Sequence, residues 1–316
     1  MSGAPIDLDA LATRVACELA RADQAGVAER RAPPAPLDVA APPVTHEAAP
    51  AGTAPGVRYV REGARIAEFI DHTVLKAETT RAEIERLCAE AMEYGFAAVC
   101  VNPVWVPLCA SLLKGSRVAL ATVVGFPLGA SQPEIKAAET ALARRQGATE
   151  IDMVAAIGHI KAGDWLHVAD DIGAVVHAAG GALVKVIIES AHLMPVEVIK
   201  ASALAREAGA QYVKTSTGFH PSGGASAEAV ALMRLVVGDT MGVKASGGVR
   251  DCATALRMIA NGATRIGTSG GVAMAQCLGR GPLPMRELLS SLAKHTDICA
   301  TGGCGPTDLP RGTGAD

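Results

Sequence analysis

The sequence predicts an α/β protein folded as a (β/α)₈ TIM barrel, with an N-terminal extension and a short C-terminal tail. Three observations predict it: short apolar or β-branched runs recur eight times, a helical pattern follows each run, and the repeats come at roughly 25–35 residue intervals. A doubly wound open sheet is the alternative. Closure is favoured because open sheets usually have fewer parallel strands, and no GxGxxG turn follows the first run.

The expected strands are short runs rich in Val, Ile and other apolar residues, bounded by helical patterns. In chain order they lie at residues 67–73, 97–101, 118–124, 150–156, 183–189, 211–217, 242–247 and 265–269.

The expected helices fill the intervals at 79–95, 102–115, 131–148, 164–180, 194–210, 227–238 and 250–263, and a last one follows Gly271. Several of these patterns end in glycine just before the next strand, as helix C-caps do. Ser131 and Asp164 stand where N-caps are expected.

Both ends of the chain differ in composition from the repeats. Residues 1–60 are expected to form an Ala/Pro-rich extension: residues 7–29 have a weak helical pattern, and residues 30–57 are typical of a linker or disordered segment. Residues 61–279 hold the eight repeats and are expected to form the barrel. Residues 280–316 are expected to form a helix and a flexible tail.

The composition excludes several classes of function. The net charge is -3 and aromatic residues make up 3% of the chain, which gives no basic footprint or stacking surface for nucleic acid. No apolar run approaches the roughly 20 residues of a membrane helix, and the first residues lack a secretory signal pattern. We therefore expect a cytoplasmic protein without nucleic-acid or membrane partners.

The eight cysteines are scattered, and they predict neither a disulfide framework nor a metal site. The five in apolar segments read as small buried hydrophobes: Cys88, Cys100, Cys109, Cys252 and Cys277. Cys299 and Cys304 are loosely spaced for a zinc pair, and no second ligand pair is nearby.

Three lysines lie in strand-like runs: Lys185 in LVKVIIES, Lys214 in YVKTSTG and Lys244 in GVKASGG. A buried ammonium loses its hydration, and the usual escape is to release the proton and become a neutral amine. A neutral amine at a strand end is a nucleophile for carbonyl carbons. The runs therefore predict a lysine-based enzyme that acts on an aldehyde or ketone.

The alternation of side chains along a strand predicts which residues share the barrel interior. If Lys214 and Lys244 point inward, so do Ser216 and Ser246. The same parity groups Lys185 with Ile187, Asp152 with Val154, and Asp71 with Thr73, whereas His72 points outward and is structural. Asp71, Asp152, Lys185, Lys214 and Lys244 are then expected to converge at one mouth, where their charges partly neutralise each other.

Lys214 is the expected nucleophile. Lowering its pKa from about 10.4 to about 7 requires roughly 4–5 kcal/mol, which water exclusion and the nearby cation of Lys244 can supply. Asp152 is the expected proton shuttle. Alternative interpretations are a buried ion pair of Lys214 with Asp152 or Glu189, and an Asp152 that only neutralises lysines. Lys185 is expected to orient substrate or hold Asp152, and Asp71 and Thr73 to bind a substrate hydroxyl.

Glycine-rich turns follow the sixth, seventh and eighth expected strands, in STGFHPSGGA, ASGGVRD and GTSGG. In barrels, backbone N–H groups of such loops commonly hold a phosphate. The candidate phosphate-binding residues are Gly218, Gly247, Gly248, Thr268, Ser269 and Gly270.

The motifs FIDHTVLK, AVCVNP, TVVGFPLG, EIDMV, LVKVIIE, YVKTSTGF, VKASGGVR and RIGTS occur in this order over about residues 66–275. In sequence and order they resemble the deoxyribose-phosphate aldolases, the class I aldolases of the DeoC family. The resemblance implies the barrel fold and the cleavage of 2-deoxy-D-ribose 5-phosphate to D-glyceraldehyde 3-phosphate and acetaldehyde. It implies no metal and no organic cofactor.

By the same resemblance, Lys214 is the Schiff-base residue, Lys244 its activating neighbour and Asp152 the acid/base that transfers protons. The SGG at 269–271 varies the small-residue pattern common in the phosphate-binding segment of the family. Members of the family are commonly dimers or tetramers, so a homodimer or homotetramer is expected. The alternatives are another class I aldolase or transaldolase acting on a different sugar phosphate, and a non-catalytic sugar-phosphate sensor.

Overall fold

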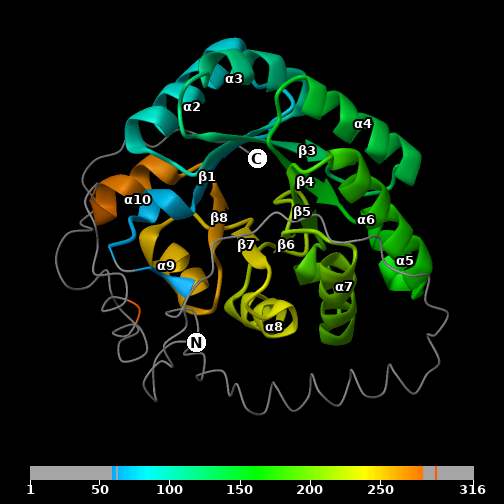
Figure 1. The fold of residues 1–316 in the computed structure, drawn as a ribbon. Coiled ribbons are helices and arrows are strands. Elements are labelled where there is room, and N and C mark those ends of the chain that lie inside the picture. Colours follow the sequence, from blue (N-terminus) through cyan, green and yellow to red (C-terminus); the bar gives the residue numbers. More distant parts are fainter. Residues whose placement is uncertain (1–58, 62, 280–288, 290–316) are drawn as a thin grey trace.

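Eight parallel strands close into a barrel in the computed structural model, which describes residues 59–61, 63–279 and 289 (Figure 1). The strands are β1 (Ile70–Val74), β2 (Ala98–Val101), β3 (Ala119–Val124), β4 (Glu150–Val154), β5 (Leu183–Ile187), β6 (Tyr212–Lys214), β7 (Gly242–Ser246) and β8 (Arg265–Thr268). Each strand pairs with the next, and β8 pairs with β1. The predicted (β/α)₈ barrel is confirmed, and the open sheet is wrong.

Helices surround the barrel on its outer side (Figure 1). They are α2 (Arg81–Tyr94), α3 (Val106–Leu112), α4 (Pro133–Arg145), α5 (Ile157–Ala162), α6 (Trp165–Ala179), α7 (Pro195–Glu207), α8 (Ala227–Val237), α9 (Cys252–Ala260) and α10 (Gly271–Leu278). Three short 3₁₀ helices, η2 (Ile66–Phe69), η3 (Pro103–Trp105) and η4 (Ser190–His192), occupy connecting segments. The main apolar core lies between the strands and this outer layer.

The structure corrects two details of the predicted elements. The first strand begins at Ile70 rather than residue 67, because Ile66–Phe69 forms η2, whose Ile66, Ala67 and Phe69 are buried. Helix α4 is capped at Gln132 and begins with Pro133, so Ser131 is not its N-cap. A proline at the first helical position has the φ that a helix requires and needs no hydrogen-bond acceptor.

Asp164 is the N-cap of α6 as predicted, since its side chain accepts a hydrogen bond from the backbone N–H of His167. The short helix α5 just before it is not among the expected helices. Its six residues are too few to give an apolar periodicity, and it ends at Gly163, which has a left-handed backbone conformation.

Most of the expected N-terminal extension and C-terminal tail lies outside the described residues, as do Cys299 and Cys304. Within the described part of the chain, no helix is both long and apolar enough to cross a membrane.

A buried ion pair fixes the end of β4 against two outer helices. Lys136 of α4 donates hydrogen bonds to the Val154 carbonyl and to Asp171 Oδ2 of α6, each at 2.8 Å. The same Asp171 oxygen accepts from the Ala156 N–H at 3.0 Å. Both side chains of the pair are fully buried, so each charge depends on the other. The pair therefore helps to position the strand that carries Asp152.

Lys136→Met should lower the free energy of unfolding by about 3–5 kcal/mol, because it leaves the Asp171 carboxylate buried and unpaired. Urea unfolding followed by circular dichroism measures this loss. The double variant Lys136→Met/Asp171→Leu should lose less than the single variant. The matched control is Lys161→Met, which removes a partly exposed pair with Glu197 and should cost at most about 1 kcal/mol. Equal stabilities of Lys136→Met and Lys161→Met would contradict the role of the buried pair.

Candidate active site

The carboxylate of Asp152 on β4 accepts hydrogen bonds from three lysines inside the barrel. Its Oδ1 accepts from Lys185 Nζ of β5 at 2.8 Å, and its Oδ2 accepts from Lys214 Nζ of β6 at 2.8 Å and from Lys244 Nζ of β7 at 2.7 Å. Each of these lysines is at most 2% exposed. The predicted convergence of Asp71, Asp152 and the three lysines is present, and it includes the contact between Lys214 and Asp152 that the alternative interpretation named.

Two more carboxylates and one guanidinium extend this cluster. Asp71 of β1 accepts from Lys244 Nζ at 2.5 Å and from Arg265 Nη1 of β8 at 2.6 Å. Glu150 of β4 accepts from Lys185 Nζ at 2.5 Å and lies 3.4 Å from Arg265 Nη2. The cluster thus contains four cationic side chains and three carboxylates, drawn from β1 and from β4 to β8.

The strand register explains how these groups meet. Lys214 is the register partner of Lys244, and Asp152 is the partner of Lys185, so each pair shares one face of the sheet. Asp71 and Lys244 belong to β1 and β7, which flank β8. They meet over Gly267 of β8, where an added Cβ would lie 2.9 Å from Lys244 Cε. A glycine at this position leaves room for the Lys244 side chain.

The charges of the cluster balance only when one lysine is neutral. Lys185, Lys244 and Arg265 supply three positive charges, and Asp71, Asp152 and Glu150 supply three negative charges. Protonation of Lys214 would add one positive charge without a carboxylate of its own, since Asp152 Oδ2 already accepts from Lys244. By contrast, Lys185 and Lys244 each donate hydrogen bonds to two carboxylates.

The lysine pKa values follow this difference. Burial lowers the pKa of Lys214, Lys244 lowers it further, and the attraction of Asp152 is too weak to compensate. Burial also acts to lower the pKa of Lys185 and Lys244, but their carboxylate neighbours outweigh it and raise both pKa values above the ordinary range. Lys214 is therefore the lysine of this cluster that most readily becomes a neutral amine.

The two aspartates of the cluster are ionised. Burial acts to raise the pKa of Asp152, but the three lysines outweigh it and hold the pKa well below its ordinary value. For Asp71, Arg265 and Lys244 likewise overcome the effect of burial and lower the pKa. The site accordingly places an accepting carboxylate next to the lysine that loses its proton most readily and next to a lasting ammonium, the set needed for nucleophilic addition with proton transfer.

On the other side of the interior the residues are small and apolar. Cys100 of β2 and Ala121 and Val123 of β3 form a separate buried cluster with Leu75. This part of the interior is therefore filled by apolar side chains and a thiol.

His72 lies on the side of β1 that parity predicted, whereas Thr73 makes a local contact with the backbone. Thr73 is half-buried and donates a hydrogen bond to the Asp71 carbonyl at 2.8 Å rather than to a group of the charged cluster. His72 lies on the outer face, with Nε2 2.6 Å from Glu90 of α2 and its ring against Phe96, as expected of a structural residue.

The glycine-rich loops after β6 and β7 lie against each other. Gly218, Gly247 and Gly248 all have positive φ, and a Cβ on Gly224 would lie 2.1 Å from the Gly247 carbonyl oxygen. The two loops can approach each other this closely only because glycine, which has no Cβ, occupies these positions. Ser216, buried beyond Lys214, has a hydroxyl without a hydrogen-bond partner among the described residues.

The expected phosphate-binding residues after β8 have different environments. The Thr268 hydroxyl donates to the Val249 carbonyl at 2.7 Å and accepts from the Gly270 N–H at 2.9 Å, so it braces its own loop. Ser269 is exposed. Their assignment to phosphate binding stays a prediction.

Three residues that shape the site are not among the site residues predicted from the sequence. Arg265 and Glu150 complete the charge balance. The alternation of side chains along β8 and β4 places both residues on the interior side of the barrel, so the sequence could have identified them. Glu189 does not contact Lys214. It is a non-glycine residue with positive φ, and its buried carboxylate accepts from the Thr217 N–H and hydroxyl, which anchors the loop after β6. No sequence pattern signals that anchor.

Comparisons with known proteins agree with this geometry. Residues 65–277 match the family model described as DeoC/LacD family aldolase. A deoxyribose-phosphate aldolase of Geobacillus sp. (strain WCH70) is 58% identical over 212 residues, which cover 67% of this chain and 95% of that protein. One from Streptococcus suis (strain 98HAH33) is 55% identical over 210 residues, covering 66% of this chain and 95% of that protein.

A solved structure of another deoxyribose phosphate aldolase is also similar to this chain. The tetrameric deoxyribose phosphate aldolase of Aeropyrum pernix superimposes with a TM-score of 0.61 at 34% identity, covering 65% of this chain and 87% of that one.

Lys244→Leu should raise the pKa of Lys214, because it removes a nearby like charge that disfavours the ammonium. The pH dependence of Lys214 methylation by formaldehyde and cyanoborohydride, followed by peptide mass spectrometry, reports this value. Lys114→Leu removes an exposed lysine and serves as the control, with no shift expected. A profile for Lys244→Leu that coincides with the control would refute the coupling of the two lysines.

Proposed function

Because the chain belongs to the DeoC/LacD family of aldolases, we propose that it is a deoxyribose-phosphate aldolase that works through a Schiff base on Lys214. The reaction is the reversible cleavage of 2-deoxy-D-ribose 5-phosphate to D-glyceraldehyde 3-phosphate and acetaldehyde, in deoxyribose phosphate catabolism. The observation that carries the proposal is the buried cluster in which Lys185 and Lys244 each bind a second carboxylate while Lys214 shares only Asp152, an arrangement that lowers the pKa of Lys214.

The first step joins Lys214 to the substrate. The neutral amine adds to the C1 aldehyde, and one amine proton passes to the oxygen to give a carbinolamine. The Lys244 ammonium, linked to Lys214 through Asp152 Oδ2, supplies a second proton, and the oxygen leaves as water. The product is an iminium, whose positive nitrogen accepts electrons in the next step.

The second step breaks the C2–C3 bond. Asp152, directly or through a water, takes the proton of the C3 hydroxyl while the bond electrons move into the iminium. C3 becomes the aldehyde of D-glyceraldehyde 3-phosphate, and C1 and C2 remain on Lys214 as an enamine. The enamine takes a proton at C2, and water then releases acetaldehyde and restores the amine.

The supporting groups of the cluster have distinct proposed tasks. Lys185 and Glu150 hold Asp152 in place, and Asp71 and Arg265 hold Lys244. The close-packed glycine loops at Gly218, Gly247 and Gly248, with Thr268 and Ser269, are the proposed phosphate-binding region. Asp71, Thr73 and Lys185 stay the proposed contacts near the sugar hydroxyl groups.

The two alternative functions would give different results in activity assays. Another class I aldolase or transaldolase would prefer a donor such as dihydroxyacetone phosphate over acetaldehyde. A sugar-phosphate sensor would bind without turnover. Cleavage of 2-deoxy-D-ribose 5-phosphate, coupled to NADH oxidation by an enzyme that reduces acetaldehyde, combined with donor competition, separates the three.

Lys214→Ala should lower the cleavage rate at least about a thousandfold, because the covalent intermediate cannot form. Borohydride added with substrate should attach a stable adduct to Lys214 in the unsubstituted protein and none in the variant. Peptide mass spectrometry locates the adduct. The control is Lys200→Ala, on the outer helix α7, which should keep the full rate and the adduct. An adduct on a different lysine would refute the assignment.

Treatment with EDTA should leave the cleavage rate unchanged, since the proposed electron sink is the iminium and no step requires a metal ion. The measurement compares initial rates before and after dialysis against the chelator. A rate that falls and is restored by a divalent metal would contradict the mechanism.

We expect the protein to act in the cytoplasm as a homodimer or homotetramer, in line with the tetrameric relative from Aeropyrum pernix. Size-exclusion chromatography with light scattering should therefore give two or four times the chain mass of 32.1 kDa. A mass of one chain at micromolar concentration would refute this expectation.

A further inference from the structure

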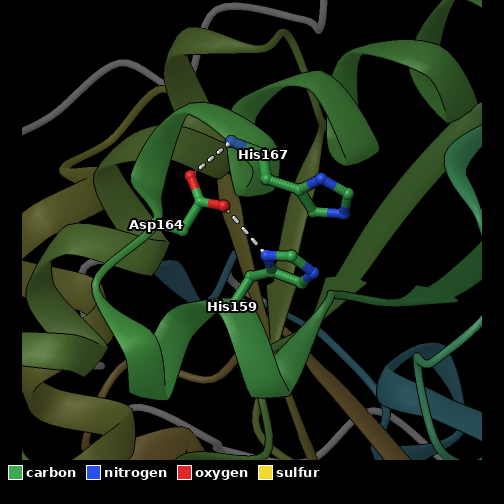
Figure 2. A group of neighbouring side chains, drawn as sticks. All are labelled: His159, Asp164 and His167. Atoms are coloured by element: carbon green, nitrogen blue, oxygen red, sulfur yellow. Dashed lines mark hydrogen bonds and ion pairs between the residues drawn. The ribbon is translucent and has the colours of Figure 1, made fainter.

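Two histidines and an aspartate meet at the corner where α5 is followed by α6, on the outer side of the barrel. Figure 2 shows His159, on α5, beside Asp164 and His167 at the start of α6. The side chains of His159 and Asp164 are about half exposed, at 45% and 48%, and His167 is partly buried. None of the three takes part in the charged cluster inside the barrel.

The spacing of their donor atoms suits a metal ion. One potential ligand atom from each residue lies within 4.8 Å of the other two. His159 Nδ1 and Asp164 Oδ2 are 3.0 Å apart. Two ligands on one tetrahedral Zn²⁺, with bonds of about 2.0–2.1 Å, are separated by roughly 3.3–3.4 Å. The cluster therefore needs to close by at most about 1.4 Å between any two ligand atoms, which rotation of side chains provides.

The backbone already holds the three residues together. Asp164 Oδ1 accepts from the His167 N–H at 3.3 Å as the N-cap of α6, and the two imidazole rings stack with centroids 3.6 Å apart. The His167 ring has no hydrogen-bond partner within residues 59–61, 63–279 and 289.

We propose that His159, Asp164 and His167 form a binding site for a divalent transition-metal ion such as Zn²⁺, Ni²⁺ or Cu²⁺. Two imidazole nitrogens and one carboxylate oxygen are ligands suited to these ions, and water completes the coordination at this exposed position. The set discriminates against Mg²⁺ and Ca²⁺, which take oxygen ligands. The bound ion replaces the contact between His159 Nδ1 and Asp164 Oδ2.

The site is a clamp on the fold and does not belong to the proposed reaction. It links α5 to the first turn of α6, and α6 carries Asp171, the partner of Lys136. Because the ion binds the folded corner, it should raise the melting temperature with increasing metal concentration. Cleavage activity should be the same with and without it, so failure of this site leaves the proposed aldolase function untouched.

Isothermal titration calorimetry of untagged, EDTA-treated full-length protein with ZnCl₂ tests the site. The unsubstituted protein should bind one more equivalent than the double variant His159→Gln/His167→Gln, and excess MgCl₂ should not displace it. Comparison with the double variant removes the contribution of cysteines and histidines elsewhere in the chain. The melting temperature should rise with ZnCl₂ by a larger amount in the unsubstituted protein than in the double variant.

Two single variants sharpen the result. His177→Gln changes an exposed histidine further along α6 and should keep the full stoichiometry. Asp164→Asn keeps a good N-cap residue but removes the carboxylate charge, so it should weaken binding at least about tenfold without unfolding the corner. Equal stoichiometry in the unsubstituted protein and the double variant would overturn the site. An unchanged affinity of Asp164→Asn for Zn²⁺ would show that Asp164 is not a ligand of the ion.

Discussion

The carboxylate of Asp152, shared by three buried lysines, is the interaction on which the interior of this barrel depends. An isolated ammonium is too costly to bury, and one carboxylate cannot neutralise three. Asp71 and Glu150 supply the missing negative charge to Lys244 and Lys185, respectively. Lys214 receives no second carboxylate, so the cluster is balanced when this lysine is the neutral one.

The same arrangement gives the three lysines different tasks although their amino groups lie close together. Lys185 and Lys244 are protonated at rest because each contacts at least two carboxylates, so Lys185 remains a fixed charge and Lys244 holds the proton that the proposed mechanism uses. Lys214 is the last residue of its short strand, where the loop with Thr215, Ser216 and Thr217 begins. Glu189 anchors that loop from the neighbouring strand connection, which fixes the backbone next to the reactive amine.

The sequence alone predicted the barrel and the principal residues of its interior because both follow from local patterns. Alternation of strand and helix signals predicts a closed barrel, and a side-chain period of two predicts that Lys214, Lys244, Asp152 and Asp71 share one side of their strands. The errors came where local signals were weak: η2 continues an apolar run that reads as strand, and α5 is too short to give a period.

Only the tertiary structure decided which charges pair. Lys244 and Asp71 are 173 residues apart and meet only because β8 closes against β1, with Gly267 leaving space between them. Arg265 reaches Asp71 for the same reason. Composition and spacing therefore determined what residues the interior contains. The pKa order of the lysines was set by barrel closure, because it depends on distances of a few ångströms between strands far apart in sequence.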